Sequence, residues 1–195
     1  MADPLRERTE RLLTDYLEYC ARDPTAPEPT PSSPEAALLR SVTAYIQQRH
    51  WSFFSAYIGY PGNRVQVVER MVKAMLSDNQ RLNWGRVVTL VTFAGTLLQR
   101  PPVEARREKQ DKSQLKEGED EVARDCQRLV ALLSSRLVGQ HRVWLEAQGG
   151  WDGFCQFFRT PLPLAFWRRL LFEVLLLCFL ATVFIYFWTR LTRNV

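Results

Sequence analysis

Cysteine and histidine are scarce in this chain of 195 residues, and neither type is clustered. The only histidines are His50 and His141, and no two cysteines form a C-x-x-C pair. This spacing argues against a zinc site and against a disulfide framework, and it favours a reducing compartment. The four cysteines are Cys20, Cys126, Cys155 and Cys178.

The sequence also has no recognisable catalytic motif. It contains neither a glycine-rich phosphate loop nor a nucleophile elbow. Its aspartates, glutamates and lysines fall on the polar faces of expected helices and in expected loops, where solvated surface charge accounts for them. We therefore expect no enzyme, no metal and no cofactor. One reading of a different class is an all-helical haem enzyme that uses His50 or His141 as its axial ligand.

A basic stripe with interleaved aromatic residues is absent too, so we expect no nucleic-acid partner. The net charge is only +5, and much of the excess flanks an apolar run near the C-terminus. The N-terminus, from Met1 to Pro4, is polar and lacks the apolar core of a signal peptide. We therefore expect the main domain, residues 1–165, to lie in the cytosol.

The apolar run itself extends from Leu170 to Thr189, broken only by Glu173. As a helix it would be about 30 Å long, which matches the hydrocarbon thickness of a bilayer. Arginines bracket it, and Phe166, Trp167, Tyr186 and Trp188 are placed to anchor it at the two interfaces. The sequence predicts a single-pass C-terminal transmembrane helix over residues 166–190, inserted after synthesis. The competing readings are a buried core helix and a helix folded back onto the domain.

The remaining apolar residues recur at helical spacing, and no segment shows the alternation of a β-strand. The pattern predicts an all-α class. The run 84–98 is apolar nearly all the way round, so we expect it at the centre of a bundle wrapped by amphipathic helices. The expected helices cover residues 4–21, 34–57, 65–76, 84–98, 119–138, 141–148 and 151–158.

Two segments between these helices are expected to be irregular. Residues 22–33 are rich in proline and are predicted to form a mobile linker. Residues 100–118 are highly charged with little to bury, so we expect a solvated, mobile loop. The sequence Ser32-Ser33-Pro34-Glu35 offers a capping box and a proline at the first helical position.

Two short motifs stand out from this helical background. The first, Asn83-Trp84-Gly85-Arg86, lies where the chain enters the central helix, with Phe93-Ala94-Gly95 two turns later. Asn83 is a plausible helix cap, Gly85 leaves a bare patch that another helix can approach, and Arg86 projects beside it. The second motif is Trp144-Leu145-Glu146-Ala147-Gln148-Gly149-Gly150-Trp151-Asp152-Gly153-Phe154.

Together these motifs resemble the first and second homology motifs of the Bcl-2 family of apoptosis regulators, in that family's order and spacing. The resemblance covers nearly the whole chain. Glu7–Arg22 is similar to the family's N-terminal homology helix, Leu38–Tyr57 to the helix with the third motif, and the tail to its membrane anchor. It implies a Bcl-2-like helical bundle.

The resemblance further implies a hydrophobic groove that binds helical motifs of pro-apoptotic relatives, with homodimers or heterodimers also open. In this mode apolar anchors of the ligand helix enter pockets while a ligand aspartate meets Arg86. The residues carried over to this partner-helix groove are Ile46, His50, Phe53, Phe54, Val72, Met75, Leu76, Asn83, Gly85, Arg86, Val88, Thr89 and Phe93.

One departure from the family pattern bears on the sign of the function. The third motif pairs a leucine with a small residue and an aspartate, whereas here Leu39 is followed by Thr43-Ala44 at the latter positions. We therefore expect a receptor for helices, and an anti-apoptotic protein at the mitochondrial outer membrane, the endoplasmic reticulum or the nuclear envelope. The alternatives are a pro-apoptotic pore-forming member and a regulator of an endoplasmic-reticulum calcium channel.

Overall fold

The computed structural model describes residues 3–76, 82–100 and 112–159. Over these residues the secondary structure is helical and contains no strand. Met1–Cys155 form one compact unit, and a second unit begins at Gln156. The elements in chain order are α1 (Pro4–Ala21), α2 (Pro34–Arg49), α3 (Trp51–Phe54), η1 (Ser55–Tyr57), α4 (Arg64–Leu76), α5 (Trp84–Leu98), α7 (Lys112–Ser134), the π-helical η3 (Ser135–Gln140), α8 (Arg142–Ala147) and α9 (Gly150–Arg159).

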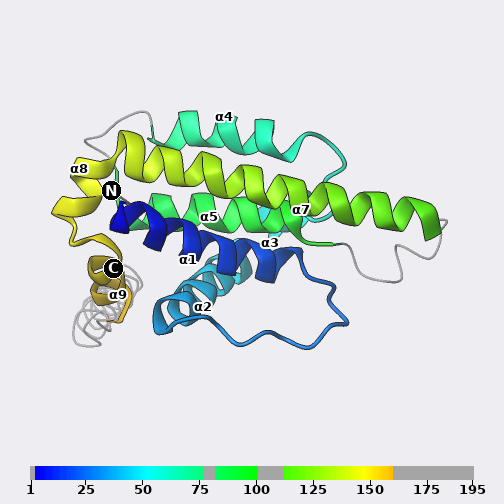
Figure 1. The fold of residues 1–195 in the computed structure, drawn as a ribbon, viewed down its shortest axis with the longest axis horizontal. Coiled ribbons are helices and arrows are strands. Elements are labelled where there is room, and N and C mark those ends of the chain that lie inside the picture. The colour runs from blue at the N-terminus through cyan, green and yellow to red at the C-terminus, as the bar shows by residue number, and fades with distance from the viewer. Residues whose placement is uncertain (1–2, 77–81, 101–111, 160–195) are drawn as a thin grey trace, which may run out of the picture. The chain divides into compact units, whose positions relative to one another are not determined.

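Helix α5 is the centre of the first unit, as the sequence predicted. It packs against α1, α2, α4 and α7, and α1 also packs along α7 (Figure 1). Twelve of its 15 residues are buried, so it has almost no face left for water. A helix that is apolar nearly all round is stable only when other helices cover it on every side.

Helix α1 begins and ends where the sequence placed it. The Asp3 carboxylate caps its first turn by accepting hydrogen bonds from the backbone N–H groups of Leu5 and Arg6. Its apolar stripe, including Leu13 and Leu17 at 0% exposure, faces the core. This stripe is what places α1 between α5 and α7.

The single helix expected over residues 34–57 is wrong, because the chain breaks at His50. Helix α2 ends at Arg49, and His50 leaves the helical region with φ −118° and ψ 37°. The carbonyl of His50 then accepts hydrogen bonds from the N–H groups of Phe53 and Phe54, which starts α3. The break turns Phe54 into the core, where it is 1% exposed.

The capping box expected at the start of α2 does not form as predicted. Ser33, and not Ser32, is the cap, and its hydroxyl accepts from the N–H of Ala36 at 3.1 Å. Pro34 at the first helical position fixes this choice. Glu35 pairs with Arg8 of α1.

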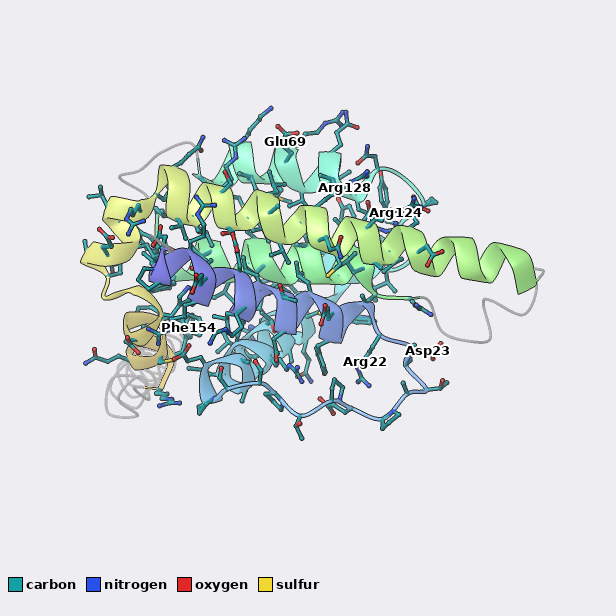
Figure 2. The ribbon with its side chains drawn as sticks, in the orientation of Figure 1. Arg22, Asp23, Glu69, Arg124, Arg128 and Phe154 are labelled. Carbon is teal, nitrogen blue, oxygen red and sulfur yellow. The ribbon has the colours of Figure 1, made fainter. Side chains whose placement is uncertain are left out.

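The predicted proline-rich linker has no helix from Pro24 to Pro31, and hydrogen bonds join it to α1 and α2. Arg40 is buried at 8% exposure and donates to the Pro29 carbonyl at 2.7 Å and to the Asp15 carboxylate at 2.7 Å. Asp15 also accepts from the backbone N–H of Ser32. Figure 2 shows the start of this linker at Arg22 and Asp23.

Helix α7 begins earlier than expected. It already includes residues 112–118, which the sequence analysis assigned to a charged loop. The segment Lys112-Ser113-Gln114-Leu115-Lys116-Glu117 consists largely of good helix formers, and their charge hid their helix propensity. The other end of α7 runs into the π-helical η3, so the predicted helix end at Val138 falls within that turn.

The predicted transmembrane anchor, residues 166–190, lies outside the described residues. Within the part of the chain that the structure describes, every helix is too short or too polar to span a bilayer.

Candidate functional site

The start of α5 brings together the residues of the first motif. The Asn83 side chain accepts a hydrogen bond from the Arg86 N–H at 3.0 Å and so caps the helix as predicted. Gly85 is exposed, and a Cβ there would meet only the Asn83 Oδ1, at 3.2 Å. Thr89 is partly exposed one turn further on, with its hydroxyl donating to the Gly85 carbonyl.

Arg86 is half-buried beside this exposed turn. Its Nη1 donates to the backbone carbonyl of Met75, at the end of α4, over 3.3 Å. No carboxylate among the described residues forms an ion pair with it. A guanidinium carries five N–H donors, so Arg86 keeps capacity for a bidentate contact with an incoming carboxylate.

An aromatic cluster joins α3 and η1 to the middle of α5. The Phe53 ring lies 5.2 Å from Phe54 and 6.1 Å from Phe93, and Tyr57 lies 4.9 Å from Phe93 in an edge-to-face contact. Sequence reasoning missed Tyr57 as a member of this site. Its position one helical turn after Phe53 was the available signal.

The predicted groove residues divide into a covered set and an accessible set. Phe54, Val72, Leu76, Val88 and Phe93 are each 3% exposed or less. Phe53 is 44% exposed. Ile46, Met75, Arg86 and Thr89 are half-buried, and His50, Asn83 and Gly85 are exposed. In this conformation the apolar floor is therefore covered, and the accessible edge consists of Phe53, the half-buried Ile46 and Met75, and polar groups.

The second motif packs directly on the first through a cluster of tryptophans. The Trp84 ring lies 5.0 Å from Trp144, 5.8 Å from Trp151 and 5.4 Å from Phe154. Trp151 and Phe154, both on α9, are fully buried, and Figure 2 labels Phe154. Burial of such large rings makes this cluster a strong local contribution to stability, which holds the start of α5 against α8 and α9.

The glycines of the second motif are required by backbone geometry. Gly149 and Gly150 have φ of +77° and +57°, in the left-handed region that glycine adopts at little cost. A Cβ on Gly153 would lie 1.6 Å from the Gln148 carbonyl oxygen, which no side chain allows. These three glycines allow the tight turn between α8 and α9.

Polar contacts then fasten α1 to the same region. Arg8 donates to the Asp152 carboxylate at 2.7 and 2.9 Å and to Glu35 at 2.5 and 3.2 Å. The hydrogen bonds from Arg8 lower the pKa of Asp152, and those from Arg142 lower the pKa of Asp3. The buried indole N–H of Trp151 donates to the Thr9 hydroxyl at 2.8 Å.

The titratable groups of the described residues include no cluster of potential metal ligands and no ready thiol nucleophile. The described residues contain no group of three His, Cys, Asp or Glu that could hold a metal ion. Burial raises the thiol pKa of Cys20 to about 12 and that of Cys126 to about 11, so neither is a ready nucleophile at neutral pH. Burial, together with the charge of Arg136, lowers the pKa of His141.

An apolar central helix capped at an arginine-bearing turn, with a double-glycine tryptophan motif packed on it, defines a helical bundle built around α5. The sequence profile "Apoptosis regulator proteins, Bcl-2 family" matches residues 39–151. The chain belongs to the Bcl-2 family and is an apoptosis regulator of that family.

Individual relatives cover almost all of the chain. It is 67% identical over 193 residues to human Bcl-2-like protein 10, covering 98% of this chain and 95% of the relative. A solved structure described as a divergent Bcl-2 protein is 50% identical, with a TM-score of 0.66, over 83% of this chain and 93% of that one. The zebrafish pro-survival protein NRZ, solved in complex with a Bad BH3, is 28% identical, with a TM-score of 0.58, over 80% and 95%.

Proposed function

We propose that the protein is an anti-apoptotic receptor that binds helical motifs of pro-apoptotic relatives in the groove between α3, α4 and the start of α5. The observation that carries the proposal is Arg86, a cation at a glycine-bearing, exposed turn whose guanidinium donates to the neutral carbonyl of Met75 and forms no ion pair within the described residues. A ligand aspartate would give it a charged partner. The zebrafish relative solved with a BH3 helix supports the same mode of binding.

Binding requires the groove to open, since its apolar floor is covered. The ligand's apolar anchors would take over the contacts that Phe53 makes with Phe54 and Phe93. This exchange is feasible because Phe53 is already half exposed. The gain in buried apolar area, at about 25 cal/mol per Å², would then drive association.

Helix α2 supports the role of receptor over that of donor. The position where a donor helix carries its aspartate is Ala44, which is exposed but has only a methyl side chain. Thr43 stands at the preceding small-residue position, where it is 1% exposed and its hydroxyl is shared between the carbonyls of Leu39 and Arg40. A helix without that carboxylate has nothing to offer a relative's arginine. The pro-survival character of the zebrafish relative agrees with this direction.

We further propose that residues 166–190 anchor the protein in an intracellular membrane, with the helical domain on the cytosolic side. The apolar run 170–189 between arginines is the support for this step.

The test is a binding titration of the full chain, held in lipid nanodiscs, against a labelled Bad BH3 peptide. We expect binding, and we expect Arg86→Ala to weaken it about tenfold or more, the value of a charged hydrogen bond. Arg128→Ala, an exposed arginine on α7, should leave the affinity unchanged. A peptide with its aspartate changed to alanine should bind wild type and Arg86→Ala equally well.

Absence of binding to the wild-type chain would refute the groove mechanism. Equal binding by wild type and Arg86→Ala would keep a groove but remove the arginine from it. Val88 is not a useful site for this test because its side chain is 1% exposed, and an aspartate there would unfold the domain before it blocked a ligand.

A further inference from the structure

A long segment on one side of the groove carries no negative charge. Residues 36–68 contain no aspartate or glutamate, although the chain has 21 in total. This segment includes most of α2, all of α3 and η1, and the start of α4. Any surface that it exposes is therefore neutral or positive.

The exposed part of this segment is rich in aromatic rings. Every residue from Gln48 to Phe53 is exposed, with Trp51 at 55% and Phe53 at 44%, and Tyr45 on α2 is 66% exposed. Tyr45 and Arg49 are four residues apart and share a helix face. We name Tyr45, Arg49, Trp51 and Phe53 the α2–α3 patch; these four exposed residues fall within nine positions of the chain, on either side of His50.

The arginine of the patch has no carboxylate partner among the described residues, unlike the other arginines of the segment. Arg40 and Arg64 are engaged by the carboxylates of Asp15 and Asp125. Arg49 forms no ion pair with any residue that the structure describes, and both it and Trp51 are exposed. The patch thus combines an exposed cation with exposed indole, phenol and phenyl rings.

This combination is the chemistry of a bilayer interface. Tryptophan and tyrosine rings favour the headgroup level, where one end of the ring is apolar and the other is wet, and arginine adds attraction to anionic lipids. A carboxylate would oppose that attraction, and the segment has none. Exposed aromatic clusters of this kind are uncommon on monomeric surfaces without a binding role.

We propose that the α2–α3 patch docks on the surface of an anionic bilayer, so that the helical domain lies against the membrane. The inference rests on the proposed anchoring by residues 166–190, since a tether at the bilayer raises the local concentration of lipid at the patch. It goes beyond that anchoring, because it fixes which face of the domain meets the lipid.

The experiment places the full chain in nanodiscs of phosphatidylcholine and phosphatidylserine, with acyl chains that carry bromine, which quenches tryptophan on contact. The Trp51 signal is the fluorescence difference between wild type and Trp51→Phe, so the other tryptophans cancel. We expect bromine to reduce this difference at least twofold. We expect no reduction in discs of phosphatidylcholine alone. We also expect none in the Arg49→Glu variant, whose Trp51 signal is the difference between Arg49→Glu and the double variant Arg49→Glu, Trp51→Phe.

The matched control is Arg128→Glu, which changes the charge by the same amount on α7, where Figure 2 labels Arg128. It should retain full quenching of Trp51. If the Trp51 signal is equally bright with and without bromine, the patch does not meet lipid and the proposal is overturned. Acrylamide in the water also quenches exposed tryptophan. If Trp51 is protected from it only in discs that hold two copies of the chain, a second copy covers the patch, and the proposal of lipid docking is overturned.

Resistance of the lipid-bound protein to an alkaline wash tests the anchor separately. If Trp51 is quenched before the wash and the wash then removes the protein, the anchor is refuted and the patch is supported. Retention without quenching would refute the patch and keep the anchor.

Discussion

At the residue scale, the Thr9 hydroxyl links α1 to the tryptophan motif. It accepts from the Trp151 indole at 2.8 Å and donates to the Leu5 carbonyl at 2.7 Å, and both Thr9 and Trp151 are 0% exposed. Thr9→Val would leave the indole N–H buried without an acceptor. We expect a loss of about 1–3 kcal/mol in the free energy of unfolding, measured by urea denaturation.

The control for this change is Thr92→Val on α5. Thr92 is equally buried, but its hydroxyl only donates to the Val88 carbonyl in its own helix. Removing it strands no donor, so the free energy of unfolding should change by less than about 0.5 kcal/mol. Equal losses in the two variants would show that the indole does not depend on Thr9.

The same scale shows which site residues a sequence can predict. The cap at Asn83 and the glycine at Gly85 were predictable because their roles are local and depend on the backbone around them. That Val88 and Phe93 are covered instead of open to a partner helix was not predictable, because α5 is apolar on every side and its sequence does not say which face a partner helix would meet. The covered floor of the groove is a property of packing.

At the scale of elements, α1 and α5 approach each other closely at Gly95. A Cβ there would lie 2.7 Å from the Tyr16 hydroxyl and 2.8 Å from the Cys20 sulfur. Both neighbours are buried side chains with little room to move. We expect Gly95→Ala to force α1 outward and to lower the free energy of unfolding by about 1–3 kcal/mol.

Gly118 on α7 provides the opposite case within the same fold. A Cβ at Gly118 would meet nothing within 4 Å, so Gly118→Ala gains helix propensity without a clash. It should raise the free energy of unfolding by about 0.5–1 kcal/mol. Urea denaturation of Gly95→Ala and Gly118→Ala measures both changes in the free energy of unfolding. A stabilising effect of Gly95→Ala would contradict the close approach of α1 and α5.

The helix boundaries show the limits of prediction at this scale. Helices α1 and α5 have caps and clear apolar patterns, and their ends were predicted to the residue. The break at His50 was missed because the apolar pattern continues through it, and only the packing of Phe54 makes the turn favourable. Residues 112–118 were missed because charge was taken as evidence for a loop, although helix formers dominate there.

At the scale of the whole molecule, contacts between the ends of the domain were beyond any local pattern. Arg8 and Asp152 are separated by 144 positions, and Thr9 and Trp151 by 142. Such pairs follow from how α1 crosses α5 and α7, which depends on all the helices together. The family resemblance supplied the arrangement, and the polar contacts that fasten it came only from the structure.

The lowered pKa values of His141, Asp3 and Asp152 make the stability of the whole molecule depend on pH, with a definite sign. Burial and the charge of Arg136 lower the pKa of His141 from 6.5, so the unfolded chain takes up a proton before the folded one does. Stability is therefore complete above about pH 6.5 and falls as the pH drops below it, by at most about 1.4 kcal/mol per pH unit. The hydrogen bonds of Asp3 and Asp152 with arginine act in the same direction, below their usual pKa of 3.8.

The measurement is the free energy of unfolding of wild type and His141→Gln at a series of pH values from about 7.5 to 5. We expect the wild-type value to fall over this range and the variant's value to stay nearly flat, since aspartates with lowered pKa remain ionised there. His50→Gln removes the other histidine, whose side chain is exposed, and should retain the wild-type slope. If His50→Gln flattens the slope and His141→Gln does not, the burial of His141 has no part in the pH response of the fold.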